Sequence, residues 1–173
     1  KTVKSSQNSA EIVRQEPLGV VGNISAFNYP LFVGSNVWIP ALLAGNAVLY
    51  KPSEHVMETG KLIAQLFAEA GVPDGVFQCI EGAGDAGREL LDQPIDGLFF
   101  TGSVNTGRAI KTALAGRMIP VQLELGGKDP AYVMDDVSDV KKAAEALADG
   151  AMFNAGQGCC SIERIYVHEN VAL

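Results

Sequence analysis

No apolar run in this sequence is long enough to cross a membrane. The longest apolar stretches are interrupted by Pro40, Gly45 and Asn46, and none approaches the ~20 residues that a transmembrane helix requires. The opening residues also lack the basic segment followed by an apolar segment that is typical of a signal peptide. We therefore expect no membrane association and no secretion. Because the first residue is Lys rather than Met, we expect a processed chain or an excerpt.

Cysteine, histidine and clustered positive charge are also scarce. Three cysteines, two of them adjacent, do not make a disulfide framework, so the expected location is the reducing cytoplasm. His55 and His168 are isolated in the sequence, so we predict no metal site. Lys and Arg number 13 against 20 Asp and Glu, a net charge of −7, and no basic cluster occurs. This balance argues against nucleic acid and anionic membranes as partners.

The residues that are present indicate an α/β protein. The 173 residues suffice for about one domain, and an apolar fraction of 47% can fill its core. Strand-like and helix-like segments alternate along the chain, which predicts βαβ units and a doubly wound, mainly parallel sheet. The expected strands are 20–26, 47–50, 76–80, 97–100, 121–125, 131–134 and 165–168; the expected helices are 31–43, 53–70, 87–91, 105–114 and one that carries Val140, Ala144, Leu147 and Ala151 on one face. In the helix over 53–70 the expected buried face is Leu62, Ile63, Leu66, Phe67 and Ala70.

A glycine-rich loop leads into the two adjacent cysteines. Residues 153–158, FNAGQG, connect a long expected helix to Cys159 and Cys160. Such a loop can hold a thiol in a cleft beside backbone N–H groups, which stabilise both a thiolate and a developing oxyanion. The alternative is a cysteine that simply fills a core, but a core cysteine does not need glycines around it. The context therefore favours a nucleophile.

A carboxylate stands near the end of the strand expected at 121–125. Glu124 lies between Leu123 and Leu125, and two glycines follow. Burial there would raise the pKa of the carboxyl, which would suit a general base at neutral pH. An ordinary outward-facing strand residue is the alternative, and the sequence favours neither.

Two glycine turns could each hold a phosphate. Residues 82–87, GAGDAG, match the G-x-G-x-x-G pattern between an expected strand and an expected helix. Residues 100–107, FTGSVNTG, also lead from a strand into a helix N-terminus. Spacing alone does not choose between the two turns.

Polar side chains follow two further strands. Lys51 could reach a hydroxyl or a phosphate, and Glu54 could accept hydrogen bonds from ribose hydroxyls. Asn28 follows the first expected strand at its carboxyl end, where ligand sites of α/β proteins gather. A solvated lysine, a first-turn glutamate favoured by the helix dipole and a plain turn residue are the alternatives.

Taken together, these segments resemble the aldehyde dehydrogenase superfamily. The two most specific pieces are LELGGK at 123–128 and the loop from Gly156 to Cys159, and Glu124 and Cys159 are 35 residues apart, about the separation in that family. The resemblance runs from about Glu16 to His168. It implies an NAD(P)-dependent oxidation of an aldehyde to a carboxylic acid, through a cysteine thiohemiacetal and a thioester.

The resemblance also implies a role for each segment. Cys159 would be the nucleophile and Cys160 its non-catalytic neighbour, and Glu124 would be the general base. Asn28 and the backbone N–H of Cys159 would form the oxyanion hole. Lys51 and Glu54 would hold the adenosine ribose of the cofactor, with NAD expected ahead of NADP because a carboxylate repels a 2′-phosphate. The pyrophosphate would lie near Gly102, Ser103, Val104, Asn105, Thr106 and Gly107, with the 82–87 turn as a tight turn beside it.

The resemblance finally implies a partial subunit. Residues 1–125 would be most of a nucleotide-binding domain, and residues 126–173 would begin a catalytic domain. The longer subunit would be a homo-oligomer that takes a small aldehyde as substrate. Two alternatives remain: an acylating dehydrogenase that passes the thioester to coenzyme A, which a carboxylate at 124 disfavours, and a fragment that only binds nucleotide or plays a structural part.

Overall fold

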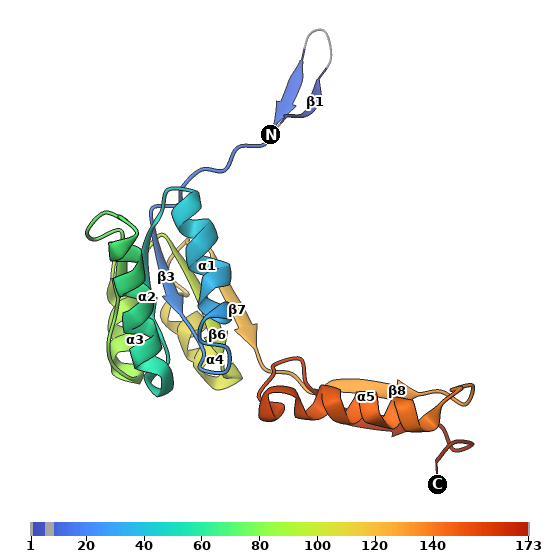
Figure 1. Ribbon diagram of the computed structural model, residues 1–173. Coiled ribbons are helices and arrows are strands. Elements are labelled where there is room, and N and C mark those ends of the chain that lie inside the picture. The colour runs from blue at the N-terminus through green and yellow to red at the C-terminus, as the bar shows by residue number, and fades with distance from the viewer. Residues whose placement is uncertain (1, 6–8, 173) are drawn as a thin grey trace.

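The computed structural model describes residues 2–5 and 9–172, and its centre is a five-stranded parallel sheet (Figure 1). Its strands are β3 (Val20–Ile24), β4 (Ala47–Lys51), β5 (Phe77–Cys79), β6 (Gly97–Gly102) and β7 (Val121–Leu125), in the order β5-β4-β3-β6-β7. The chain therefore adds β4 and β5 on one side of β3, and then crosses back to add β6 and β7 on the other side. This reversal beside β3 is the switch point of a doubly wound sheet. The predicted fold class is confirmed.

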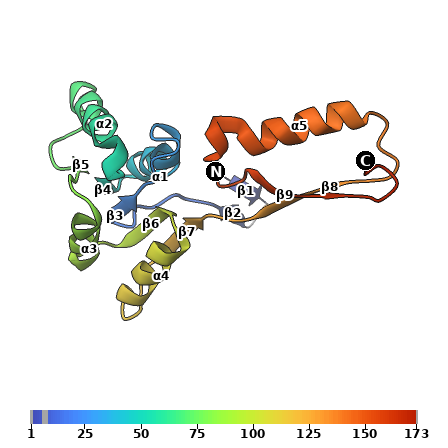
Figure 2. The ribbon, with the colours of Figure 1, turned by 90° about the horizontal axis from the view of Figure 1, so that it is seen from below.

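Helices cover both faces of the sheet (Figure 2). On one face lie α1 (Phe32–Leu43) and α2 (Met57–Glu69), which a short 3-10 turn at Glu54–Val56 precedes; on the other lie α3 (Gly84–Asp92) and α4 (Val104–Ala113). The first pair packs Trp38 and Ile63 against β4, and the second packs Leu90 and Ile110 against β3 and β6. Two apolar cores thus lie on opposite faces, as a buried parallel sheet requires.

The buried stripe of α2 is narrower than expected. Ile63 is buried and Phe67 packs beside it, but Leu62 and Leu66 are each about half exposed. Gly60 completes the buried stripe, because a Cβ there would lie 2.3 Å from Cγ of Pro52. Positions 60, 63 and 67 share one helical face, whereas 62 and 66 are turned about 100° away from it.

Arg117, in the turn that follows α4, binds the end of α3 and the loop that leads from α3 to β6. One guanidinium nitrogen, Nη1, donates to the carbonyl oxygens of Leu91 and Gln93, both at 2.9 Å, and Nη2 donates to the carbonyl oxygen of Ile95. The planar fork of the guanidinium can serve several acceptors at once. One side chain therefore ties the turn after α4 to residues 91–95, more than twenty positions earlier in the chain.

Two smaller units lie outside the central sheet. Strands β8 (Asp129–Val133) and β9 (Ile162–Val167) form a parallel pair, joined by α5 (Val140–Met152) and a short 3-10 turn at Phe153–Gly156. Strands β1 (Thr2–Ser5) and β2 (Ala10–Ile12) form an antiparallel pair that stands apart from the sheet (Figure 1) and that the sequence reading did not predict. In the part of the chain that the structure describes, no helix is long and apolar enough to span a membrane.

Candidate active site

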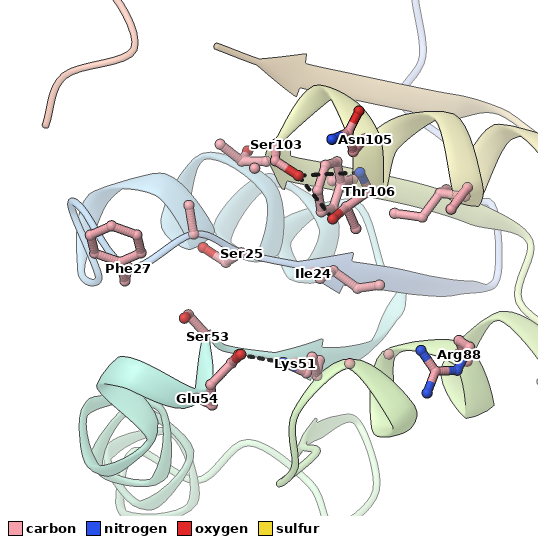
Figure 3. Close-up of a pocket in the computed structure, with 18 of the residues that line it drawn as sticks. Ile24, Ser25, Phe27, Lys51, Ser53, Glu54, Arg88, Ser103, Asn105 and Thr106 are labelled. Atoms are coloured by element: carbon pink, nitrogen blue, oxygen red, sulfur yellow. Dashed lines mark hydrogen bonds and ion pairs between the residues drawn. The ribbon is translucent and has the colours of Figure 1, made fainter.

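A cavity of about 770 Å³ opens where β3, β4 and β6 end, between α3 and α4 (Figure 3). Its size is that of a small-molecule site, and its position beside the switch point is the usual ligand position in a doubly wound sheet. Both glycine turns contribute to its wall: Gly84 and Gly87 come from the first, Gly102 and Ser103 from the second. The 82–87 segment was expected to be a tight turn beside the site; in the structure Gly84 and Gly87 belong to the first turn of α3, which lines the cavity.

Lys51 and Glu54 meet on the β4 side of the cavity (Figure 3). Lys51 is 4% exposed; its Nζ donates to the carbonyl oxygen of Pro52 at 3.1 Å and lies 3.5 Å from Oε2 of Glu54. The Glu54 side chain remains half exposed at the rim. A hydrogen bond from its own backbone N–H lowers the pKa of the Glu54 carboxyl, and the Lys51 charge lowers it further against the opposing effect of partial burial. The site thus presents one buried cation and one ionised carboxylate.

The opposite wall is the N-terminus of α4. Ser103 caps this helix: its Oγ accepts from the backbone N–H of Thr106 at 3.2 Å and donates to Oγ1 of Thr106 at 2.9 Å. Gly102, Ser103, Asn105 and Thr106 all line the cavity. Backbone N–H groups at such a helix start favour an anionic ligand.

Val104 and Gly107 do not line this cavity, although the sequence reading grouped them with the turn. Gly107 is buried against β7, where a Cβ would lie 2.8 Å from Cδ2 of Leu125. Its glycine therefore permits close packing between helix and strand.

Several lining residues had no place in the sequence prediction. Ser25 and Phe27 follow β3, Ser53 and His55 flank Glu54, and Arg88 lies on α3. The G-x-G-x-x-G match was the available signal for the α3 side, since Arg88 comes directly after it.

A second cavity, of about 500 Å³, brings Cys159 and Glu124 together. Residues of α1 form much of its wall, and Phe100 and Thr101 line both this cavity and the larger one. The end of β6 is therefore a partition between the two. At the Cys159 side, a Cβ on Gly127 would lie 3.8 Å from the Cys159 carbonyl oxygen, so the segment after β7 passes close to the cysteine loop, which we define as residues 154–159.

Of the two alternatives that the sequence left open for Glu124, the structure shows the outward-facing strand residue. Glu124 is exposed, and its Oε1 accepts a hydrogen bond from Nε2 of Gln122 at 3.0 Å. The reason is the position of β7 at the edge of the sheet. Helix α4 covers the face of β7 that carries Leu123 and Leu125, whereas α1 packs mainly on β3 and β4 and leaves the face of Gln122 and Glu124 open. Cys159 and Cys160 are exposed as well.

Asn28 reaches the cysteine loop across 129 positions of sequence. Its Nδ2 donates to the carbonyl oxygen of Gln157 at 2.8 Å, and Nδ2 of Asn154 donates to the Asn28 carbonyl oxygen at 2.9 Å. Among the described residues, nothing accepts a hydrogen bond from the backbone N–H of Cys159. Asn28 is thus bonded to the loop that ends at Cys159, and Cys159 shares a cavity with Glu124. Within the same described part of the chain, no group of three or more His, Cys, Asp and Glu side chains could hold a metal ion.

The fold and the site together define a class of protein. Its members have a doubly wound α/β domain with a cavity at the switch point, and this domain is joined to a loop that carries a cysteine. The sequence model of the aldehyde dehydrogenase family matches residues 1–172, and the chain belongs to this family. The resemblance drawn from the motifs is confirmed.

Individual relatives agree with this assignment. A 4,4′-diapolycopene aldehyde oxidase from Methylomonas is 47% identical over 157 residues, which is 91% of this chain and 29% of the relative. The structure of a Mycobacterium tuberculosis aldehyde dehydrogenase complexed with NAD+ is 40% identical with a TM-score of 0.85, and covers 95% of this chain and 34% of its own. The structure of a 3,6-anhydro-L-galactose dehydrogenase in complex with NADP is 37% identical with a TM-score of 0.86. The match covers 99% of this chain and 36% of the dehydrogenase chain. The chain spans about a third of the length of the relatives it matches.

Proposed function

We propose that this chain supplies the nucleotide site and the nucleophile of an NAD(P)-dependent aldehyde dehydrogenase. Residues 1–125 are assigned to nucleotide binding and residues 126–173 to the start of the catalytic domain. The observation that carries the proposal is the partition at Phe100 and Thr101, because one cavity with a cation, a carboxylate and a helix N-terminus adjoins another with a thiol and a carboxylate. Reaction between a bound cofactor and a substrate held on the thiol needs such adjacent chambers.

The larger cavity fits the cofactor by the chemistry of its donors. Glu54 can accept from ribose hydroxyls, Lys51 can donate to them, and Ser103 and Thr106 start the helix whose N-terminus favours the pyrophosphate. Two structural neighbours carry NAD+ and NADP, which supports a nicotinamide dinucleotide here. Such a cofactor, held by Lys51, Glu54 and the start of α4, would supply the hydride acceptor for the oxidation.

The smaller cavity supplies the covalent chemistry. The Cys159 thiolate attacks the aldehyde carbonyl carbon and forms a thiohemiacetal, whose oxyanion receives hydrogen bonds from Nδ2 of Asn28 and the backbone N–H of Cys159. Losing one such donor typically costs about 2.7–4 kcal/mol of barrier. After the oxidation, a thioester joins the acyl group to Cys159.

Glu124 completes the cycle as general base. It takes a proton from water, the hydroxide adds to the thioester, and the carboxylic acid leaves as the thiolate is restored. A carboxylate in the cysteine cavity favours water over coenzyme A as the acceptor.

We also propose the cytoplasm as the compartment and a homo-oligomer as the assembled state. Within the residues that the structure describes, Cys79, Cys159 and Cys160 are free thiols, which suits a reducing compartment.

The test separates the two adjacent cysteines in the complete protein that carries these residues. Cys159→Ala should abolish aldehyde-dependent NADH formation, because no nucleophile remains. Cys160→Ala should keep most of this activity, because Cys159 remains. It is the matched control, since it removes one sulfur atom from the adjacent position of the same segment. Activity would be followed by NADH absorbance across a panel of aldehydes, with cofactor binding measured in parallel. Retained activity in Cys159→Ala would overturn the assignment.

A further inference from the structure

Three residues form a closed hydrogen-bond circuit between the turn after β3 and the cysteine loop. Nδ2 of Asn154 donates to the Asn28 carbonyl oxygen at 2.9 Å, and Nδ2 of Asn28 donates to the Gln157 carbonyl oxygen at 2.8 Å. Gln157 returns to Asn154, because its Nε2 donates to the Asn154 carbonyl oxygen at 3.0 Å. The circuit ends two residues before Cys159.

We propose that Asn154 is a positioning residue for the reaction: it fixes the backbone of Asn28 so that the Asn28 amide faces the carbonyl that Cys159 attacks. This inference rests on the proposed function. Asn154 acts through Asn28 and needs no contact of its own with the substrate.

The backbone at Asn154 is shaped for this task. Asn154 has φ 50° and ψ 40°, and Ala155 has φ 56° and ψ 31°, so two successive residues adopt the left-handed conformation. Asparagine tolerates this conformation better than most residues, whereas alanine does not. This left-handed turn follows the end of α5. It lies where Nδ2 of Asn154 donates to the Asn28 carbonyl oxygen. Such a costly conformation persists only when surrounding contacts hold it.

The orientation of the Asn28 amide follows from the same circuit. A primary amide carries two N–H donors, so the Gln157 carbonyl takes one and the second remains for a substrate oxygen. Exchanging the ends of the amide would place Oδ1 against the Gln157 carbonyl oxygen, where two acceptors would repel each other. Oδ1 is buried without a partner among the described residues, so no other group competes to turn the amide.

The variant that tests this role is Asn154→Asp in the complete protein. Aspartate has the same size and also tolerates the left-handed backbone, but it sets an oxygen instead of an N–H against the Asn28 carbonyl. Asn154→Gly is the second variant, because it keeps the backbone and removes the amide. Ala155→Gly is the matched control, since it relaxes the neighbouring left-handed residue and removes no polar group.

Two rates on Cys159 separate positioning from general structural damage. The first is the burst of NADH formation with a reactive aldehyde, which needs the oxyanion donor. The second is alkylation of Cys159 by iodoacetamide, followed by peptide mass spectrometry, in which no oxyanion develops. Both Asn154 variants should slow the burst roughly 10- to 100-fold, as small misplacements of a reacting group do, with alkylation unchanged. Ala155→Gly should change neither rate.

A double-variant comparison decides whether Asn154 acts through Asn28. In an Asn28→Ala background the burst is already slow, and adding Asn154→Asp should slow it no further. An additional loss there, or a parallel fall of burst and alkylation in both Asn154 variants, would overturn the positioning role. A wild-type protein with no burst for any aldehyde would overturn the proposed function and this role with it. A wild-type burst that Asn154→Asp leaves unchanged would overturn this role alone.

Discussion

Replacing Glu54 with glutamine should weaken the discrimination between NAD and NADP. The carboxylate of Glu54 lies at the rim of the larger cavity, 3.5 Å from the Lys51 ammonium. If it accepts from the ribose hydroxyls, then a 2′-phosphate at that position meets a negative charge. Glutamine keeps the shape and removes the charge, and it also leaves the buried Lys51 free to attract the phosphate.

The size of the effect follows from the exposure of Glu54. Two unit charges 4 Å apart interact by about 1 kcal/mol in water and by about 4 kcal/mol near a protein surface. The Glu54 side chain is 51% exposed, which favours the lower value. A phosphate monoester carries about 1.5–2 negative charges at pH 7. The penalty against NADP is therefore about 2 kcal/mol, or roughly 30-fold in the ratio of dissociation constants.

The pH dependence has a definite sign. Because its own backbone N–H and Lys51 lower the pKa of the Glu54 carboxyl, this group stays ionised down to the acid side of the ordinary carboxyl range. Between pH 5 and 8 the titrating partner is then the 2′-phosphate, whose second pKa is about 6. Discrimination should decline as the pH falls through 6 in the wild type, and should vary less in Glu54→Gln.

Calorimetric titration of both cofactors, with the complete protein, measures the ratio. Glu58→Gln is the matched control, because it removes the same charge four positions away, on a side chain that is 87% exposed and paired with Lys61 outside the cavity. An unchanged ratio in Glu54→Gln, or an equal change in Glu58→Gln, would refute the reasoning. Tighter binding of NADP than of NAD by the wild type would contradict the expected preference.

Two further predictions concern turnover and the isolated chain. Glu124→Gln should keep the burst of NADH but lose about 10²–10⁴-fold in steady turnover, with an acyl adduct on Cys159 trapped by mass spectrometry; near-normal turnover would move coenzyme A ahead of water as acceptor. The 173 residues expressed alone should self-associate and show no steady turnover, because large apolar side chains such as Met152 and Phe153 are exposed. Gel filtration checks this, and a monodisperse, active monomer would contradict it.

The parts of the fold that local chemistry decides were predictable from sequence. The strand at 121–125 has the predicted bounds, because Pro120 precedes it and Gly126 follows it. Helix α1 was also predicted, despite Pro40 within it. Its end at Leu43 follows from Gly45 and Asn46, which come directly after the last turn.

Features decided by distant partners were not predictable. Nothing near Glu124 in the sequence says that β7 is an edge strand, because that depends on the order of all five strands. The bonds between Asn28 and the cysteine loop join residues more than 120 positions apart, and neither residue carries a local signal of its partner. The motif resemblance, by contrast, grouped Asn28, Glu124 and Cys159 as candidate catalytic residues without giving any of these contacts.

The Arg117 fork has a consequence for how a ligand enters the larger cavity. This cavity lies between α3 and α4, and Arg117, in the turn after α4, donates hydrogen bonds to carbonyl oxygens at the end of α3. We expect these bonds to hold the end of α3 and the turn after α4 at a fixed separation, so that little of the cavity wall rearranges when a ligand binds. A nucleotide that enters has little protein left to order, so more of its contact energy appears as affinity. Its association should proceed in a single kinetic phase, without a slow closing step between encounter and the final complex.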